Sequence, residues 1–186
     1  MIAAPLASDR RGRASSELAH LPANRGSVRS RAVRLPVGLC RVIYRSAYVA
    51  MRSYWFVRRP NVRGVKCVLT DGEQVLLVRH TYGHREWDLP GGKIRWREAP
   101  DRAAHREMHE ELGVRVPEWS PLGLVEAEFD HRRDHMHCFS ADVSGQRLRP
   151  DPCELAAVSW FPRRALPSEL GRFVERILAL ADAGTP

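Results

Sequence analysis

The sequence predicts a mixed α and β protein whose strands and helices do not follow the regular alternation of a doubly wound fold. Short β-rich runs recur from residue 62 onward and are separated by turn residues, while two stretches with helical periodicity lie among and after them. The length of 186 residues and the hydrophobic content of 44% are sufficient for one domain with a buried core.

The chain divides into three segments. Residues 1–36 are rich in Arg, Ser, Ala, Gly and Pro and lack apolar periodicity, which predicts a disordered basic segment or a translation start placed too far upstream. Residues 37–59 form the second segment, in which apolar and aromatic residues dominate 37–58 before Pro60, and this predicts one amphipathic helix. Residues 60–186 form the third segment, the main domain.

The helix expected at 37–58 has two interpretations. Arginines among aromatic residues suit a helix that lies on a membrane surface, with the arginines at the depth of the lipid headgroups. The alternative is a helix packed on the domain or on a second subunit in a homodimer. Because Arg41, Arg45 and Arg52 do not segregate cleanly to one face, the sequence favours the packed helix.

A hairpin opens the main domain. The runs Val65–Thr70 and Gln74–Arg79 are rich in β-forming residues and flank the turn Asp71-Gly72, a strong short-range hairpin signal. Later runs of the same kind predict further strands at Leu122–Phe129, His135–Val143 and Leu155–Phe161.

Two helices are expected in this domain. The first covers Pro100–Leu112, because Pro100 suits a first helical turn and Gly113 suits the position just after a helix. The second covers Pro167–Asp182, where Leu170, Phe173, Ile177 and Leu180 recur at helical spacing.

The net charge of +8 is distributed unevenly. Residues 1–60 contain 12 Arg and two acidic residues, whereas residues 61–186 contain 18 Lys and Arg and 20 Asp and Glu. The main domain therefore has no overall attraction for a polyanion, so nucleic acid is not the expected partner and any phosphate binding must be local.

The cysteines and the hydropathy indicate a cytoplasmic protein. The four cysteines show no C-x-x-C spacing, and a chain of this length does not need disulfides to fold. No apolar run approaches the roughly 20 residues that span a bilayer, and no compact apolar segment of a secretory signal is present.

Three carboxylates are expected on one face of the helix at 100–112. Glu107, Glu110 and Glu111 stand at positions i, i+3 and i+4, and Arg106 stands four residues before Glu110 and can pair with it. Such like charges destabilise a bare helix, and a hard divalent ion such as Mg²⁺ would compensate them. An isolated E-x-x-E-E is more often a solvated acidic face, so the wider spacing decides.

That wider spacing resembles the signature of the Nudix hydrolase family. The signature G-x5-E-x7-R-E-U-x-E-E-x-G-U, in which U is a bulky apolar residue, is matched at every fixed position from Gly92 to Val114. The preceding Trp87-x-Leu-Pro-Gly-Gly and the later Glu154–Pro162 (ELAAVSWFP) are also similar to family segments.

The resemblance implies an α/β fold of the Nudix type, an α/β/α sandwich around a mixed sheet. It implies that Mg²⁺ or Mn²⁺ is held by the carboxylates of Glu107, Glu110 and Glu111 and by the backbone carbonyl of Gly91. Glu98 would bind or support the metal, Arg106 would orient the glutamates, and Glu107 is the leading candidate for the general base.

The same resemblance implies hydrolysis of a phosphoanhydride bond in a nucleoside diphosphate linked to another moiety, which releases a nucleotide and a phosphate-containing product. The substrate within this nucleotide-like class stays open, because the sequence arrays that mark NADH, coenzyme A and ADP-ribose subfamilies are not clearly present. The alternative is a catalytically silent domain that binds a nucleotide and regulates another process.

Four residues near the box are candidate substrate contacts. Lys93, Arg95 and Arg97 would lie on one face of a strand and could contact phosphates, although an exposed charged strand edge would have the same pattern. Trp87 could stack on a base, but an aromatic residue is more often used for packing.

Overall fold

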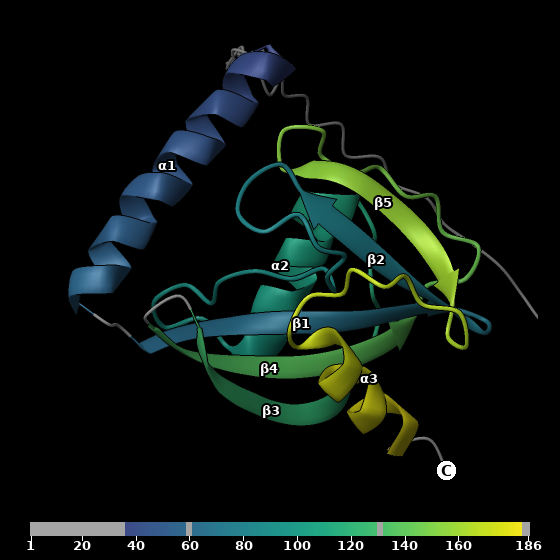
Figure 1. Ribbon diagram of the computed structural model, residues 1–186. Coiled ribbons are helices and arrows are strands. Elements are labelled where there is room, and N and C mark those ends of the chain that lie inside the picture. The colour runs from purple at the N-terminus through teal and green to yellow at the C-terminus, as the bar shows by residue number, and fades with distance from the viewer. Residues whose placement is uncertain (1–35, 59–60, 130–131, 184–186) are drawn as a thin grey trace, which may run out of the picture. The chain divides into compact units, whose positions relative to one another are not determined.

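The computed structural model describes residues 36–58, 61–129 and 132–183 (Figure 1). The segment 1–35, for which disorder was expected, lies outside the described residues. Within these ranges, one five-stranded sheet has the order β3-β4-β1-β2-β5 and is accompanied by three helices. In chain order the elements are α1 (Val37–Arg58), β1 (Asn61–Asp71), β2 (Gln74–His80), α2 (Pro100–Leu112), β3 (Ser120–Phe129), β4 (Arg132–Asp142), β5 (Leu155–Pro162) and α3 (Val174–Ala183).

The sheet is mixed, as the resemblance implied. β1 pairs in parallel with β4, while its other neighbour, β2, is antiparallel and continues the sheet to β5. The hairpin between β1 and β2 is present, but Asp71 still pairs with Gln74, so the two turn residues are Gly72 and Glu73. Gly72 has φ 58°, a value that glycine adopts without strain, and this explains the one-residue shift from the predicted turn.

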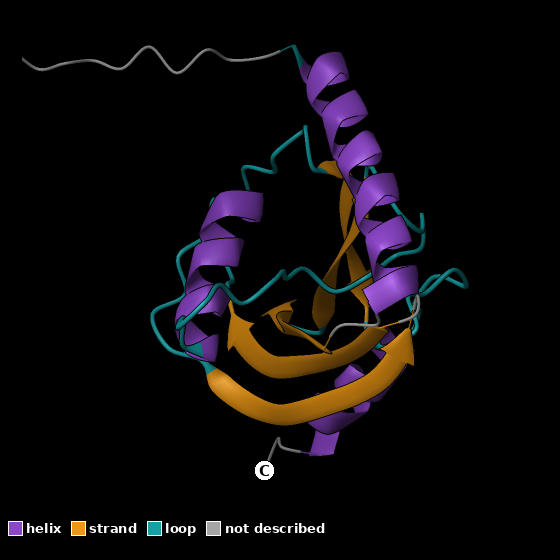
Figure 2. Cartoon of the chain, turned by 90° about the vertical axis from the view of Figure 1, so that its left-hand side faces the viewer, coloured by secondary structure: helices purple, strands orange, loops and turns teal. Residues whose placement is uncertain are grey.

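Helices α2 and α3 cover opposite faces of the sheet, which confirms the predicted α/β/α sandwich (Figures 1 and 2). Alternate β1 residues point to the two sides: Val65, Cys67 and Leu69 pack with α2, and Val68 packs with α3. Both apolar clusters are almost fully buried, so the sheet has a core on each face.

Helix α2 has the bounds that the sequence predicted. It begins at Pro100 and ends before Gly113, which adopts a left-handed conformation (φ 68°) and donates its N–H to the carbonyl oxygen of His109. Ala104, Met108 and Leu112 are fully buried against the sheet. Glu107 and Glu111 lie at the edge of this packed face, and Glu111 is itself buried.

The prediction that the last helix begins at Pro167 is wrong, because α3 begins at Val174. The missing turns are replaced by extended backbone that pairs with the Trp87 loop. Trp87 N–H donates to the carbonyl of Glu169 (2.8 Å), and Gly171 N–H donates to the carbonyl of Trp87 (2.7 Å). The apolar residues Leu170 and Phe173, whose spacing suggested a helix, pack in the core although the backbone that carries them is not helical.

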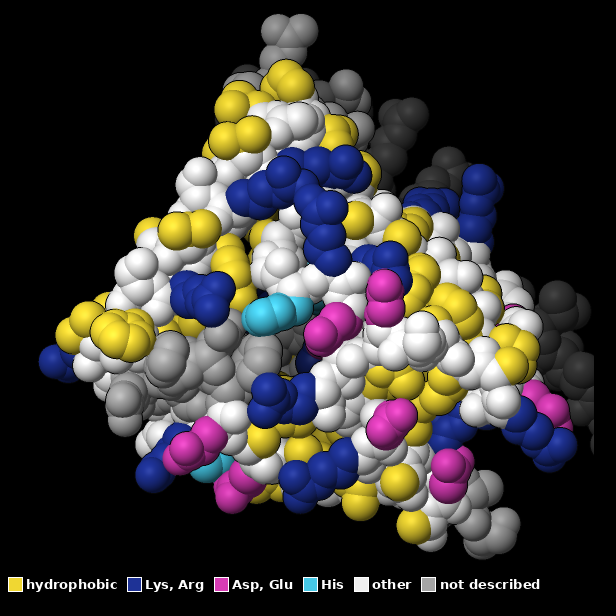
Figure 3. Space-filling model, viewed as in Figure 1, with side chains coloured by type: hydrophobic (Ala, Val, Ile, Leu, Met, Phe, Trp, Pro, Cys, Tyr) yellow, Lys and Arg dark blue, Asp and Glu magenta, His cyan; other side chains and the backbone are white. Residues whose placement is uncertain are grey.

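Helix α1 occupies the predicted range and exposes most of its apolar side chains. At 100° per residue, Arg41, Arg45 and Arg52 lie on one stripe, which corrects the expectation that the arginines do not segregate. Arg41 and Arg45 both bond to the domain. In Figure 3, hydrophobic side chains follow the outer edge of α1 and basic ones lie between the helix and the body.

None of the helices within the described residues has the length and hydrophobicity that crossing a membrane requires.

Candidate active site

Arg106 forms hydrogen bonds with three carboxylates of the candidate site. Its Nε donates to Glu98 Oε1 (2.8 Å), and its Nη1 donates to Glu107 Oε1 (2.6 Å) and to Glu110 Oε2 (3.1 Å). The predicted pairing of Arg106 with Glu110 is present, and it is one of three. A guanidinium with fixed donor geometry therefore sets the positions of two box glutamates on α2 and one in the preceding loop.

Glu98 is held in the charged form. Hydrogen bonds from Arg106, and a further one from the backbone N–H of Arg95 (2.7 Å), lower the pKa of Glu98 to about 2. The side chain is 14% exposed and both of its oxygens accept these bonds. In this arrangement Glu98 supports Arg106 and the loop.

The double glycine lets the loop approach β1 and α2 closely. The carbonyls of Pro90 and Gly92 accept hydrogen bonds from β1, so the carbonyl of Gly91 between them points away from that strand. A Cβ on Gly91 would lie 2.1 Å from the Val65 carbonyl oxygen, and one on Gly92 would lie 2.3 Å from the carboxyl carbon of Glu107. Gly91 therefore requires glycine for steric reasons, whereas a side chain at Gly92 would displace the Glu107 carboxylate.

The carboxylates of Glu107 and Glu111 are both removed from solvent and both lie near other negative charges. Burial raises the pKa of Glu107 despite the opposing effect of Arg106, and burial followed by the nearby Glu154 raises the pKa of Glu111 well above its usual range. Glu111 is 1% exposed and accepts a hydrogen bond from Gly91 N–H (3.2 Å). A cation between these groups would relieve both desolvation and repulsion.

Two side chains that the sequence reasoning did not identify complete this cluster. His80, Glu111 and Glu154 bring one ligand atom each to within 4.8 Å of one another. Burial lowers the pKa of His80 to about 4, so its imidazole is neutral and able to act as a ligand. In the sequence, only their positions at strand ends could have indicated that they belong to the site. His80 ends β2, and Glu154 immediately precedes β5.

Glu110 faces the more open side of the site. Its side chain is 49% exposed and pairs with Arg95 (3.2 Å) as well as with Arg106. Helix α2 thus presents the buried carboxylate of Glu111, the mostly covered one of Glu107 and a third, that of Glu110, at the rim.

The three basic residues after the double glycine are not on a strand. Lys93 makes a single bridge with Gly64, and Arg97 has φ 61° in a turn, so the expectation of strand alternation is wrong. All three side chains are exposed, but Arg95 pairs with Glu110 and thereby lies at the rim of the carboxylate cluster. The turn is imposed by the hydrogen bonds that join residues 95 and 98.

Trp87 packs inside the domain. Its ring meets Phe161 edge-on at 4.8 Å between centroids, and the Arg79 guanidinium lies 4.7 Å above it. It is grouped with the apolar cluster on the α3 face of the sheet. This placement favours the packing interpretation of Trp87.

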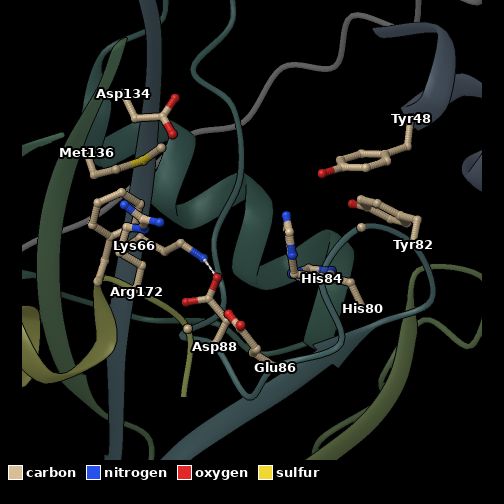
Figure 4. A pocket seen from close by; sticks show the side chains of 13 residues that line it. Tyr48, Lys66, His80, Tyr82, His84, Glu86, Asp88, Asp134, Met136 and Arg172 are labelled. Atoms are coloured by element: carbon tan, nitrogen blue, oxygen red, sulfur yellow. Dashed lines mark hydrogen bonds and ion pairs between the residues drawn. The ribbon is translucent and has the colours of Figure 1, made fainter. Parts of the chain in front are cut away.

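A pocket of about 170 Å³ shares His80 with the carboxylate cluster (Figure 4). Lys66 Nζ, on its floor, binds Asp88 Oδ2 (2.6 Å) and the carbonyl of Leu89 (2.8 Å). Asp134 and Met136 of β4 form one side, and Tyr48 and Tyr82 face them from the other. The pocket therefore combines aromatic rings with fixed polar groups, which is the usual composition of a small-molecule site.

The donor set suits a divalent cation. The carboxylates of Glu111 and Glu154 and the neutral imidazole of His80 bring their ligand atoms close together, and no cysteine joins them in the cluster that the described residues form. Carboxylate oxygens of this kind fit Mg²⁺ and Mn²⁺.

Comparison with known proteins agrees with this geometry. The family model described as "NUDIX domain" matches residues 60–180. An "ADP-ribose pyrophosphatase" of Mycobacterium tuberculosis is 44% identical over 105 residues, which cover 52% of this chain and 51% of that protein. An "RNA pyrophosphohydrolase" of Saccharophagus degradans is 35% identical over 75 residues, which cover 40% of this chain and 42% of that protein.

Among solved structures, a MutT NUDIX hydrolase from Burkholderia pseudomallei is similar with a TM-score of 0.61 and 25% identity. The alignment covers 64% of this chain and 97% of that one. The chain spans 41% and 65% of the length of two further curated relatives, so these likenesses concern a part of each protein.

Proposed function

The chain belongs to the Nudix family, and we propose that it hydrolyses a phosphoanhydride bond in a nucleoside-diphosphate-like substrate with the help of a divalent metal ion. The observation that carries the proposal is the combination of a complete signature with converging side chains. Glu111 is buried on α2, the side chain of Glu107 is 13% exposed, and Glu154 reaches Glu111 from a distant part of the chain.

We propose Mg²⁺ as the metal, with Mn²⁺ as the alternative. Glu107, Glu110, Glu111 and Glu154 would supply carboxylate oxygens, the Gly91 carbonyl would add a backbone oxygen, and His80 a ring nitrogen. When bound, such an ion neutralises the diphosphate and makes water more acidic. The raised pKa values of Glu107 and Glu111 support this assignment, because uncompensated buried carboxylates are otherwise costly.

The protein's own groups would then perform three tasks. Glu107 accepts the proton of the water that attacks phosphorus, while the bond between phosphorus and the bridging oxygen breaks and the leaving phosphate departs. Arg106 keeps Glu107 and Glu110 in place through its short hydrogen bonds. Glu98 fixes Arg106 rather than contacting the substrate, since Arg106 and the Arg95 backbone occupy its oxygens.

The pocket beside His80 would receive the part of the substrate beyond the diphosphate. A nucleoside fits its combination of tyrosine rings and carboxylates, because rings stack and base N–H groups donate to carboxylates. Lys93, Arg95 and Arg97 are exposed, Arg95 pairs with Glu110, and in this proposal the three meet the phosphates. We propose that the protein acts in the cytoplasm, because its four free cysteines suit a reducing compartment.

A second candidate function is a silent domain that binds nucleotides without hydrolysing them. The buried carboxylate cluster argues against it, because burying Glu111 at 1% exposure is unfavourable for folding and is explained best by a bound cation.

The test is release of phosphate or pyrophosphate from a panel of nucleoside triphosphates, nucleotide sugars and dinucleoside polyphosphates in Mg²⁺ or Mn²⁺. Wild type is compared with Glu110→Gln and Glu111→Gln, and with Glu118→Gln as a control at an exposed position outside the site. Turnover that needs metal, persists in the control and is lost in both site variants is the expected result. Nucleotide binding without any turnover by folded, metal-loaded wild type would favour the silent domain.

A further inference from the structure

The inner side of α1 is fastened to the two loops that carry the outer part of the metal cluster. Arg45 Nε donates to the carbonyl of Thr81 (3.0 Å), one residue after His80. Arg41 Nε donates to the carbonyl of Pro152 (3.1 Å), two residues before Glu154. The helix therefore reaches His80 and Glu154 from outside the stretch that matches the family.

Aromatic rings continue this connection to a carboxylate. Tyr44 of α1 stacks on Tyr82 with 5.5 Å between centroids and 10° between planes, and Tyr48 lies 5.9 Å from the same ring. The Tyr82 hydroxyl donates to Glu154 Oε1 (2.7 Å). Two α1 rings thus pack on the side chain that orients Glu154.

Tyr48 also borders the pocket itself. Its ring comes from α1, and Figure 4 shows its hydroxyl directed toward the space between Lys66, Asp134 and His84. The loop at Gly83 fits closely beneath it, since a Cβ there would lie 3.2 Å from the Tyr48 ring. Edge-to-face packing with Trp55, the buried residue of α1, holds the ring at this position.

We propose that α1 is a wall of the substrate pocket and that Tyr48 contacts the nucleoside moiety. This inference rests on the proposed function and deepens it, because it assigns substrate selection to a helix outside residues 60–180. The base of the nucleoside, or another ring of the substrate, packs against Tyr48. Tyr82 positions Glu154 beside the diphosphate.

The test measures binding and turnover separately. Calorimetry with the α,β-methylene analogues of ADP, GDP, CDP and UDP in Mg²⁺ compares wild type, Tyr48→Ala, Tyr48→Phe and Tyr54→Ala. Tyr54 is a matched control, since it is 54% exposed on α1 and does not line the pocket. Tyr48→Ala is expected to bind about tenfold more weakly or worse, because the loss of one aromatic stacking contact has this size. Tyr48→Phe keeps the ring and is expected to bind like wild type, as is Tyr54→Ala.

Steady-state kinetics complete the test. A raised KM with nearly unchanged kcat in Tyr48→Ala, at unchanged thermal unfolding, is expected of a wall that touches substrate outside the reacting atoms. Equal analogue affinities in wild type and Tyr48→Ala would overturn the proposal that α1 is a wall of the pocket. If wild type also turns over substrate, the proposed function would still stand. Wild type that neither binds analogues nor turns over substrate would overturn the proposed function and the wall with it.

The outer face of α1 provides a separate observation. Leu39, Ile43 and Val57 recur on one stripe and are 47%, 48% and 76% exposed. Val42, Val49 and Phe56 adjoin this stripe, and no charged residue of α1 lies among them. A contiguous exposed apolar face of this kind marks an interaction surface.

We propose that this outer face docks on an anionic lipid bilayer. Charge complementarity favours a bilayer over a second copy, because residues 1–60 contain 12 Arg and two acidic residues and α1 contains no acidic residue. Arg41 and Arg45 bond to the domain on the inner side of α1, so the exposed Arg52 and Arg58 are the arginines of α1 that would meet lipid phosphates. A second copy would instead place these like charges close together.

Co-sedimentation with lipid vesicles tests the docking. Vesicles of phosphatidylcholine alone are compared with phosphatidylcholine mixed with phosphatidylglycerol, using full-length wild type and the triple variant Leu39→Ser, Ile43→Ser and Val57→Ser. Leu124→Ser, which removes an exposed leucine from β3, is the control. Wild type and the control are expected to sediment with the anionic vesicles, with about tenfold weaker partitioning of the triple variant.

Failure of wild type to sediment with either vesicle, or equal sedimentation of the triple variant, would overturn the docking. Equal sedimentation of wild type with both vesicle types would overturn the preference for anionic lipid. A wild-type dimer that the triple variant converts to a monomer, without vesicle binding, would assign the face to a second copy.

Discussion

Arg106 is the residue whose geometry is most demanding, because one guanidinium bonds to Glu98, Glu107 and Glu110. We expect Arg106→Lys to keep the charge but lose this arrangement, which lowers turnover by at least about tenfold. Unfolding in urea is expected to become easier by about 1–3 kcal/mol, since buried carboxylate oxygens lose donors.

Arg102→Lys is the matched control for that substitution, since Arg102 is exposed on the same helix. Equal stability and turnover of the two variants would show that Arg106 acts only as a positive charge.

Gly92 is the second demanding position. A methyl group in Gly92→Ala would collide with the Glu107 carboxylate, which would have to move. We expect turnover to fall by about a hundredfold, because displacement of a reacting group by an ångström has that effect. Gly38→Ala, where nothing lies within 4 Å of the added Cβ, is the control. Turnover of Gly92→Ala near the wild-type value would contradict the close approach of Glu107.

At the residue level, the sequence predicted the box glutamates because they belong to one helix with fixed spacing. It did not reveal His80 and Glu154, because their meeting depends on the pairing of β2 with β5, which sets His80 opposite Leu155. Partners separated by more than 70 residues are joined by strand register, and no local pattern specifies that register.

At the level of elements, the contact between α1 and the domain can be tested with native cysteines. Cys40 of α1 forms a side-chain hydrogen bond with Cys153, which raises the pKa of Cys153 to about 11. We expect diamide to oxidise this pair: the two thiols lose two hydrogens, a disulfide forms, and diamide is reduced to the hydrazine. Mass spectrometry of the intact and digested protein detects the bond.

Cys40→Ser is the control for the oxidation, since it removes one partner from an exposed helix. Buried Cys67 and Cys138 are expected to stay reduced under the same treatment. Persistence of both Cys40 and Cys153 as free thiols in oxidised wild type would contradict the docking of α1 at this place.

Element boundaries were predictable where proline or glycine marked them. Pro100 and Gly113 delimited α2, and the hairpin signal placed β1 and β2 with a one-residue error in the turn. The start of α3 was missed, because backbone pairing with Trp87 replaces the first helical turns and leaves the side-chain periodicity intact. The division into segments 1–36, 37–59 and 60–186 stays a prediction.

For the whole molecule, metal binding is expected to raise thermal stability. At a metal concentration about a hundred times Kd, binding stabilises by about 2.7 kcal/mol, which corresponds to roughly 5–10 °C in Tm for a chain of this size. Scanning fluorimetry of wild type in EDTA, Mg²⁺ and Mn²⁺ measures the shift.

The same measurement on Glu111→Gln is expected to lose most of the metal-dependent shift. Its stability in EDTA should equal or exceed that of wild type, because an uncompensated buried charge has been removed. Glu175→Gln, exposed on α3, is expected to behave like wild type. A full metal-dependent shift in Glu111→Gln would remove Glu111 from the proposed ligands.

The parallel pairing of β1 with β4 has a consequence for how the chain folds. The register joins Asn61 to Arg133, so the central strand finds one of its two neighbours only after the intervening segment, including α2, has been made. Closing so long a loop is slow compared with forming a local hairpin. During synthesis, β1 and β2 can pair early, whereas the side of β1 that β4 covers stays open until the last strands emerge. Assembly of the carboxylate cluster is therefore expected to be a late event in folding, because Glu154 enters it from the residue just before β5.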